Sequence, residues 1–228
     1  MADDVKTHRR LTTERVVDAA LDAADEDGIE AVSLRRLAAA LKVTPMAIYR
    51  HVRNKSHLLD LMAERLLEQL DLAQDEMASW QDRLRRLLGS YLSVAAAHRA
   101  APFLLSRPVA SPAVARTTEA LLAILHSAGL DARQSARFLQ VISGMLLGPA
   151  LHRAAWAAAR GRSPDAAGQQ APMEALAAEE FPYSSSAVQF LDWSPGPEAD
   201  RLTIELLVRG LEALADFPNG GQAARTER

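Results

Sequence analysis

The sequence of 228 residues contains no cysteine, so it offers neither a disulfide framework nor a thiolate metal site. No run of apolar residues approaches the roughly 20 that a membrane-spanning helix needs, and the polar N-terminus lacks a secretory signal region. No glycine-rich phosphate loop is present, and no His and carboxylate arrangement predicts a metal site. These absences favour a soluble, cytoplasmic protein with no cofactor, no metal and no membrane partner.

Apolar residues make up 49% of the chain, which is enough for a packed core. Clean two-residue alternation is missing, whereas apolar residues recur at helical spacing through nearly every long segment. The pattern predicts an all-α fold. We expect helices near residues 12–28, 34–41, 45–52, 54–70, 80–98, 102–107, 111–128, 131–160, 173–180 and 197–217, with loops at 161–172 and 181–197.

One stretch differs from the rest of this slightly acidic chain. From Ala31 to Leu59 there are six Lys and Arg residues and no Asp or Glu. Ser33, Thr44 and Asn54 each precede a short apolar-periodic segment, where they are expected to cap helices, and Pro45 occupies a first helical position. Two short capped helices joined by a turn, within a basic stretch, are typical of a helix-turn-helix.

Ten residues of this stretch are candidates for contacts with DNA. Small or adaptable side chains at a recognition-helix start allow close approach to base edges, and polar or cationic side chains bond phosphates. We expect base contacts from Pro45, Met46, Ala47 and Arg35, and phosphate contacts from Ser33, Thr44, Tyr49, Arg50, His51 and Lys55. The alternative is that the charges form an ordinary solvated face and that Tyr49 belongs to the core.

The segment from Leu37 to Leu61, LAAALKVTPMAIYRHVRNKSHLLDL, resembles the DNA-binding signature of TetR-type regulators. Beyond about residue 65 the resemblance lies in the order and length of the helices and in the turn Glu180-Phe181-Pro182. Lys42 departs from the family pattern, which has glycine before this valine, where the turn needs a positive φ. A lysine there either strains the turn or adds a phosphate contact.

The resemblance implies a three-helix helix-turn-helix domain at residues 1–57, a larger helical ligand-binding and dimerisation domain at 58–218, and a disordered tail at 219–228. It also implies a homodimer on a palindromic operator. Apolar stripes near residues 131–160 and 197–217, including Leu207, Leu211 and Leu214 on the second helix, fit a four-helix interface. The same stripes can instead be the core of the domain itself.

For a small-molecule effector, the candidates are aromatic, Met and His residues of the central body that would suit a drug-sized, largely apolar ligand. They are His98, Phe103, Phe138, Met145, His152 and Trp156. The competing interpretation is that the aromatic residues pack in the core and that the histidines are structural. The turn Glu180-Phe181-Pro182 resembles that of the tetracycline-repressor-like subgroup of the family, but the metal-mediated tetracycline binding of that subgroup is not carried over to this chain.

The favoured function is a ligand-responsive transcriptional repressor whose effector releases it from DNA. Two alternatives remain open at this point. One is an enzyme on an apolar metabolite that uses His98 or His152 as a general base. The other is a ligand-independent DNA-binding activator with a fully packed body.

Overall fold

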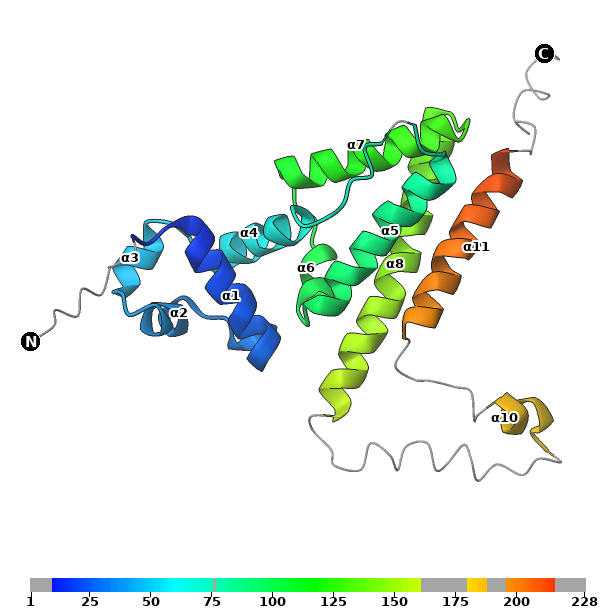
Figure 1. Cartoon of the computed structure of the whole chain (residues 1–228). Helices are drawn as coiled ribbons and strands as arrows, with labels where there is room; N and C mark the ends of the chain where they lie inside the picture. The colour runs from blue at the N-terminus through cyan, green and yellow to red at the C-terminus, as the bar shows by residue number, and fades with distance from the viewer. Residues whose placement is uncertain (1–9, 76, 161–179, 188–195, 216–228) are drawn as a thin grey trace, which may run out of the picture. The chain divides into compact units, whose positions relative to one another are not determined.

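The computed structural model describes residues 10–75, 77–160, 180–187 and 196–215, and within these ranges the regular elements are all helices, as predicted (Figure 1). None of the described helices is both long and apolar enough to cross a membrane. The chain forms two compact units. The first holds the residues up to Gln69 together with Ala97–Ala115, and the second holds Leu70–Ala96 and the chain from Arg116 onward. The first unit therefore extends beyond residue 57.

The first unit is built around the N-terminal helices. Its elements are α1 (Thr13–Asp27), a short 3₁₀ turn (Ile29–Ala31), α2 (Leu34–Ala40), α3 (Pro45–Tyr49), α4 (Lys55–Leu67) and α6 (Ala101–Leu105). Helix α1 packs against α2 and α4, α2 packs against α3, and α4 packs against α6. The fully buried large side chains of this unit are Leu37, Ile48, Leu58, Met62, Leu66 and Leu104. Helices α2, α3, α4 and α6 each contribute at least one of these large side chains, and α1 contributes the smaller buried residues Val16, Ala20 and Ala24.

Capping residues set most of the boundaries in this unit. The Thr12 side chain accepts a hydrogen bond from the Arg15 amide at the start of α1, and Gly28 ends that helix with a φ of 89°. These boundaries agree with the helix expected near residues 12–28. Helix α3 was predicted to reach Val52 but ends at Tyr49, because the Ile48 carbonyl accepts from both the His51 and the Val52 amides and the last turn tightens. Val52 is nevertheless fully buried.

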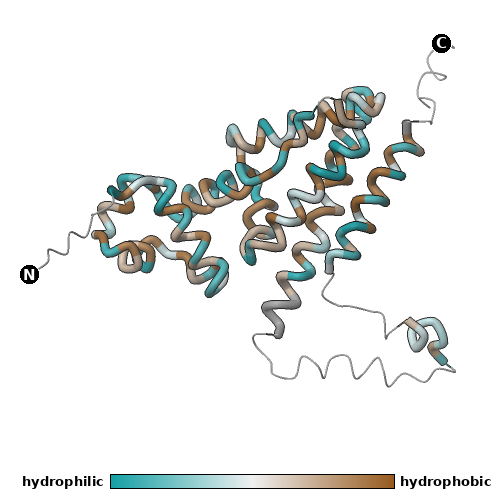
Figure 2. Tube along the Cα trace, viewed as in Figure 1, coloured by the Kyte–Doolittle hydropathy of each residue, from teal (hydrophilic) through white to brown (hydrophobic). Residues whose placement is uncertain are grey.

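The second unit packs long helices side by side. It contains α5 (Trp80–Ala97), α7 (Pro112–Ser127), α8 (Ala132–Arg160), α10 (Pro182–Ala187) and α11 (Pro197–Ala215), with the ends of α5 and α7 belonging to the first unit. In Figure 2 hydrophobic and hydrophilic residues alternate along α5 and α11, as amphipathic helices require. The core takes residues from α5, α7, α8 and α11, among them Leu84, Leu88, Ile124, Ile142 and Leu211.

An ion pair joins two of these helices at the edge of the core. The Arg85 guanidinium donates to both carboxylate oxygens of Glu205, at 2.6 and 3.0 Å, and so connects α5 with α11. This hydrogen bonding lowers the pKa of Glu205 and raises that of Arg85. Both side chains are more than a third exposed, so the pair orients the helices more than it stabilises them.

Two expectations for the second half of the chain were wrong. Residues 181–197 were expected to form a loop, but Pro182–Ala187 form helix α10, in which the Ser185 amide donates to the Phe181 carbonyl. Proline at the first helical position favours this start. Leu207 and Leu211 were assigned to a dimer interface, but both lie in the core of their own unit, as do Phe138, Ile142 and Leu146 of α8. The expected helix at 173–180 lies outside the described residues except for Glu180, and the expected tail lies outside them entirely.

Leu211 provides a test of this core. We expect Leu211→Ala to lower the free energy of unfolding by about 2–5 kcal/mol, since Leu211 is fully buried between helices and its removal leaves a cavity. Urea denaturation measures the change. Met77→Ala, at a side chain that is almost fully exposed, serves as the control and should change stability by less than about 0.5 kcal/mol. Equal effects of the two substitutions would contradict the packing described here.

Candidate nucleic-acid interface

The segment from Ser33 to Lys55 folds as two short helices and the start of a third, each opened by a side-chain cap. Ser33 Oγ accepts from the Arg36 amide at 3.2 Å, Thr44 Oγ1 accepts from the Ala47 amide at 3.3 Å, and Asn54 Oδ1 accepts from the His57 amide at 2.9 Å. All three caps were predicted from the sequence. Each cap leaves further amides of the first turn free, and such amides attract anions.

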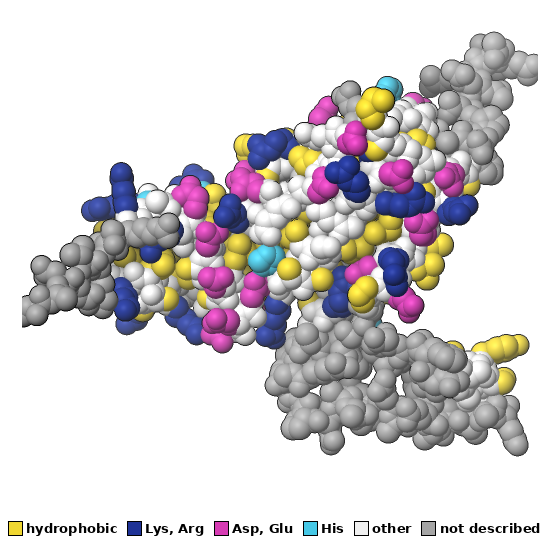
Figure 3. Space-filling view, in the orientation of Figure 1, with side chains coloured by type: hydrophobic (Ala, Val, Ile, Leu, Met, Phe, Trp, Pro, Cys, Tyr) yellow, Lys and Arg dark blue, Asp and Glu magenta, His cyan; other side chains and the backbone are white. Residues whose placement is uncertain are grey.

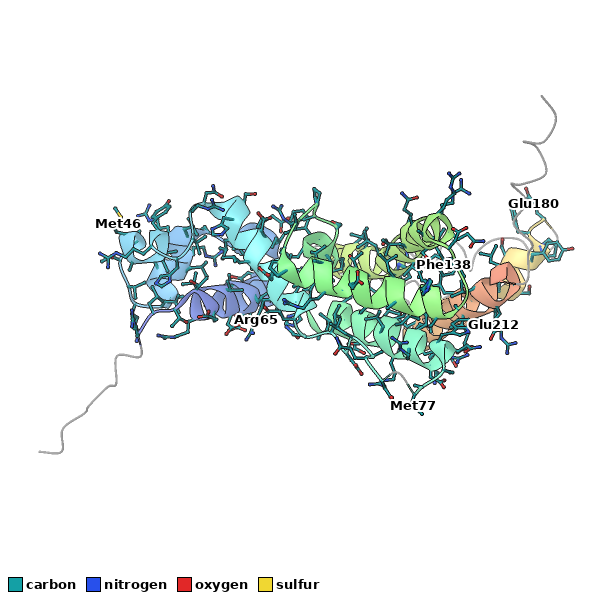
Figure 4. All side chains as sticks on the ribbon, turned by 90° about the horizontal axis from the view of Figure 1, so that it is seen from above. Met46, Arg65, Met77, Phe138, Glu180 and Glu212 are labelled. Carbon is teal, nitrogen blue, oxygen red and sulfur yellow. The ribbon has the colours of Figure 1, made fainter. Side chains whose placement is uncertain are left out.

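Burial determines which side of α3 faces outward. Ile48 is fully buried, whereas Met46 is 67% and Tyr49 is 52% exposed. Thr44, Pro45 and Arg50 are exposed as well, and Ala47 is half-buried. In Figure 4 the Met46 side chain projects outward from α3 at the end of the first unit. The start of α3 thus presents small or unbranched side chains to solvent, a surface that can approach base edges closely.

Basic side chains surround this surface, and Figure 3 shows Lys and Arg gathered around the end of the first unit where α2 and α3 lie. Five of them are exposed and make no side-chain hydrogen bond or ion pair with any described residue: Arg35, Lys42, Arg50, Arg53 and Lys55. Arg36 differs, because it donates to Asp27 at 2.8 Å and to the Ala31 carbonyl, which ties α2 to the end of α1. Cations without an acceptor in their own unit remain available to phosphate oxygens.

His51 has a structural contact that sequence reasoning missed. Its Nδ1 lies 3.2 Å from Thr13 Oγ1, so the ring connects the residues after α3 to the first turn of α1. The ring is half-buried, and its other nitrogen, Nε2, has no partner among the described residues. The predicted phosphate contact would therefore come from Nε2 of a ring that α1 already orients.

Two residues, Arg107 and His98, hold the segment 97–115 against the helix-turn-helix through polar contacts. Arg107 donates to Asp60 Oδ1 at 2.7 Å and to Ser56 Oγ at 3.1 Å, both on α4. His98 Nδ1 lies 2.7 Å from Asp25 Oδ2 on α1. Between 47 and 73 residues separate these partners along the chain. No periodicity reveals contacts at such separations, and only the opposite charges could have suggested them.

The six residues predicted to bind an effector do not form one group. His98 and Phe103 belong to the first unit, where His98 pairs with Asp25 and Phe103 is about half exposed on α6. In the second unit, Phe138 is part of the core, Met145 packs against it, and His152 is exposed. The side chain of Trp156 lies outside the described residues. Phe138 and Met145 are thus the pair that the structure brings to the same core.

Tyr91 is a candidate that sequence reasoning missed. It lies on α5, packs against the core of the second unit, and its hydroxyl makes no hydrogen bond with any described residue. Burial raises the pKa of this hydroxyl to about 12. Since Tyr91 is only partly buried, its hydroxyl is a group that a ligand bound against this core can contact.

Comparison with known proteins matches both halves of the chain to known domains. The model of the tetR family of bacterial regulatory proteins matches residues 16–62, and that of the tetracyclin repressor-like C-terminal domain matches residues 72–215. The tetracycline repressor protein class D from Escherichia coli is 30% identical over 210 residues, which cover 89% of this chain and 90% of that protein.

Two further relatives come from Streptomyces. The transcriptional repressor DrrR1 from Streptomyces coeruleorubidus is 33% identical over 145 residues, so the match spans 61% of this chain but only about half, 53%, of that protein. The crystal structure of ActR from Streptomyces coelicolor in complex with actinorhodin superposes with a TM-score of 0.74 at 26% identity, covering 91% of this chain and 98% of that one.

The ionisation of Tyr91 tests its burial. Since its pKa is higher in the folded state than in the unfolded state, folding stability is unaffected below pH 10 and decreases as pH rises from 10 toward 12. We expect one of the three tyrosines of the chain to ionise only near pH 12, followed by phenolate absorbance. This step should be absent in Tyr91→Phe. A late step that persists in Tyr91→Phe would assign it to another residue.

Proposed function

Since this chain belongs to the tetR family of bacterial regulatory proteins, we propose that it is a transcriptional repressor that binds a palindromic operator as a homodimer and is released by a small, largely apolar effector. The observation that carries the proposal is the surface around α3. There a capped helix start presents Pro45 and Met46 to solvent among exposed cations that have no acceptor in the described residues.

On DNA, α3 enters the major groove. Met46 and Ala47 contact base edges, and Arg35, at the start of α2, donates in a bidentate manner to guanine. Tyr49, Arg50, His51 and Lys55 bond phosphates on the flanking strands, and Ser33 and Thr44 offer their hydroxyls and helix-terminal amides. In a dimer the two α3 helices occupy successive major grooves, about 34–36 Å apart for half-sites one helical turn apart.

The dimer forms through α8 and α11. After their core residues are accounted for, both helices keep a second, exposed apolar stripe. On α11 it comprises Leu202, Leu206 and Leu214, spaced by four and eight residues with exposed Gly210 between them, and on α8 it comprises Val141 and Leu151 with exposed Gly144 and Gly148. A Cβ added at Gly144, Gly148 or Gly210 would meet no atom within 4 Å, so a partner helix can approach closely there.

Effector binding belongs to the second unit, where Tyr91, Phe138 and Met145 pack at one core. The ActR structure that resembles this chain holds actinorhodin, which supports a drug-sized ligand here as well. The effector acts on DNA binding through residues 97–115, which continue from α5 and hold α4 through the Arg107–Asp60 pair. A ligand that binds better to the state with widely spaced α3 helices lowers the population bound to the operator.

The test of this function is binding to DNA flanking the gene. We expect a competitor-resistant complex of a dimer with a palindromic site, measured by fluorescence anisotropy. Arg35→Ala should cost about 1–3 kcal/mol and relax the base preference at one position of each half-site, whereas Tyr49→Phe should weaken binding to all sequences alike.

Arg133→Ala, an exposed arginine on α8 with no partner among the described residues, is the matched control and should leave binding unchanged. An Arg35→Ala variant that keeps the wild-type base preference would remove Arg35 from the base contacts. Binding by wild type that does not distinguish the site from competitor DNA would contradict the function itself. If the complex forms but no compound releases it in a ligand screen, the ligand-independent regulator becomes the better description.

The exposed apolar stripes of α8 and α11 lead to a separate prediction about the dimer. Leu206→Asp places a charge on the exposed stripe of α11 without touching the core, so it should shift the protein from dimer to monomer in sedimentation equilibrium while helicity is retained. Met77→Asp, at another exposed apolar side chain, is the control and should leave the dimer intact. A Leu206→Asp dimer as tight as wild type would place the interface elsewhere.

A further inference from the structure

The turn between α2 and α3 contains a lysine in a backbone conformation that favours glycine. Lys42 has a φ of 55°, and in this left-handed region a Cβ lies close to the following carbonyl. The conformation is fixed by two hydrogen bonds that end α2: the Val43 amide donates to the Ala38 carbonyl at 2.9 Å, and the Lys42 amide donates to the Ala39 carbonyl at 3.1 Å. This pair of bonds is the Schellman motif, with Lys42 at its left-handed position.

The same chain builds the same motif elsewhere with glycine. After α7 the Leu130 amide donates to the Leu125 carbonyl and the Gly129 amide donates to the His126 carbonyl, with a φ of 91° at Gly129. One other described non-glycine residue has a positive φ, Ala73, but it is fully buried and its amide and carbonyl are held by Asp71 and Arg83. Lys42, by contrast, is exposed and its side chain has no partner among the described residues. Neither packing nor an internal hydrogen bond explains a lysine at this position.

Lys42 is close to the start of α3, the helix that presents the outward surface. It lies two residues before Thr44, the cap of α3, so its Cα is at most about 7 Å from the Thr44 Cα. A flexible stem of four methylenes carries the ammonium further, and Arg35 on α2 and Arg50 after α3 are exposed as well. We propose that Lys42 binds a DNA phosphate next to the groove that α3 enters, and that this contact is obtained at the expense of backbone strain in the turn. The proposal rests on the proposed function, since it names a phosphate contact of the same DNA complex.

The strain is measured without DNA. Lys42→Gly and Lys42→Asn, whose residues tolerate the left-handed region, should each raise the melting temperature, by on the order of 2–4 °C for glycine. Gly129→Lys is the matched control: a Cβ there meets no atom within 4 Å, so a lysine in the second unit should lower the melting temperature by a similar amount through backbone strain alone. Unchanged or lower melting temperatures for both Lys42 variants would overturn the claim of strain.

The phosphate contact is measured with the operator at salt concentrations between about 50 and 200 mM. For Lys42→Gly and Lys42→Asn, the slope of log K against log salt should become shallower by about 0.9 for each protomer, with base preference retained. Lys42→Arg keeps the charge and should keep the slope. If Lys42→Gly is more stable and its slope equals that of wild type, Lys42 is not a phosphate contact and the proposal fails. Absence of specific binding by wild type is a different result, which contradicts the proposed function instead.

Discussion

The five-residue helix α3 has no stability of its own, and the surface that it presents depends on how the first unit holds it. Isolated helices shorter than about 12–15 residues are marginal in water, so α3 must be fixed by tertiary contacts. Ile48 and Val52 are fully buried beneath it, and the Thr44 cap fixes its start. Contacts from α1 and α4 complete the support: His51 meets Thr13, and the Asn54 cap begins α4 directly after the turn. Because buried and capping residues hold α3 in place, its exposed residues are not needed for packing and can contact DNA.

The same constraint explains why the local structure around α3 was easier to predict than the packing of the second unit. Ser33, Thr44 and Asn54 act on amides three residues away, so their chemistry is local and can be recognised in the sequence. The exposed side of α3 follows from Ile48 and Val52 by helical spacing alone. Arg107 and His98, however, meet their partners across 47 and 73 residues, and such contacts depend on the whole fold. Those two residues hold the segment 97–115 on the first unit, a connection that no local pattern predicts.

In the second unit, helical periodicity did not determine which side of each helix faces the core, and the reason is different. A helix that packs on its own core and also carries a second apolar face has two hydrophobic stripes, and spacing alone does not say which stripe faces inward. Leu207 and Leu211 were assigned to the interface but are in the core, whereas Leu206, one residue earlier, is 56% exposed. One residue corresponds to a rotation of about 100° around the helix, which is enough to exchange the two assignments. The helices 131–160 and 197–217 were correctly located, and their orientation could only come from the three-dimensional packing.

In this chain, whether a charged side chain has a partner indicates its role better than the number of charges does. On α5, all three arginines bond acceptors within their own unit: Arg83 bonds the Ala73 carbonyl, Arg85 bonds Glu205, and Arg86 bonds Asp71. Around α3, the cations of Arg35, Lys42 and Arg50 are exposed and find no acceptor among the described residues. Like charges that lack partners repel one another, and at Lys42 the backbone adds strain to that cost. Both the repulsion and the strain oppose folding of the isolated protein. Binding of a polyanion to this surface offsets them, since neutralised phosphates release their counterions. The turn and α3 are therefore best explained as a surface that is adapted to bind DNA.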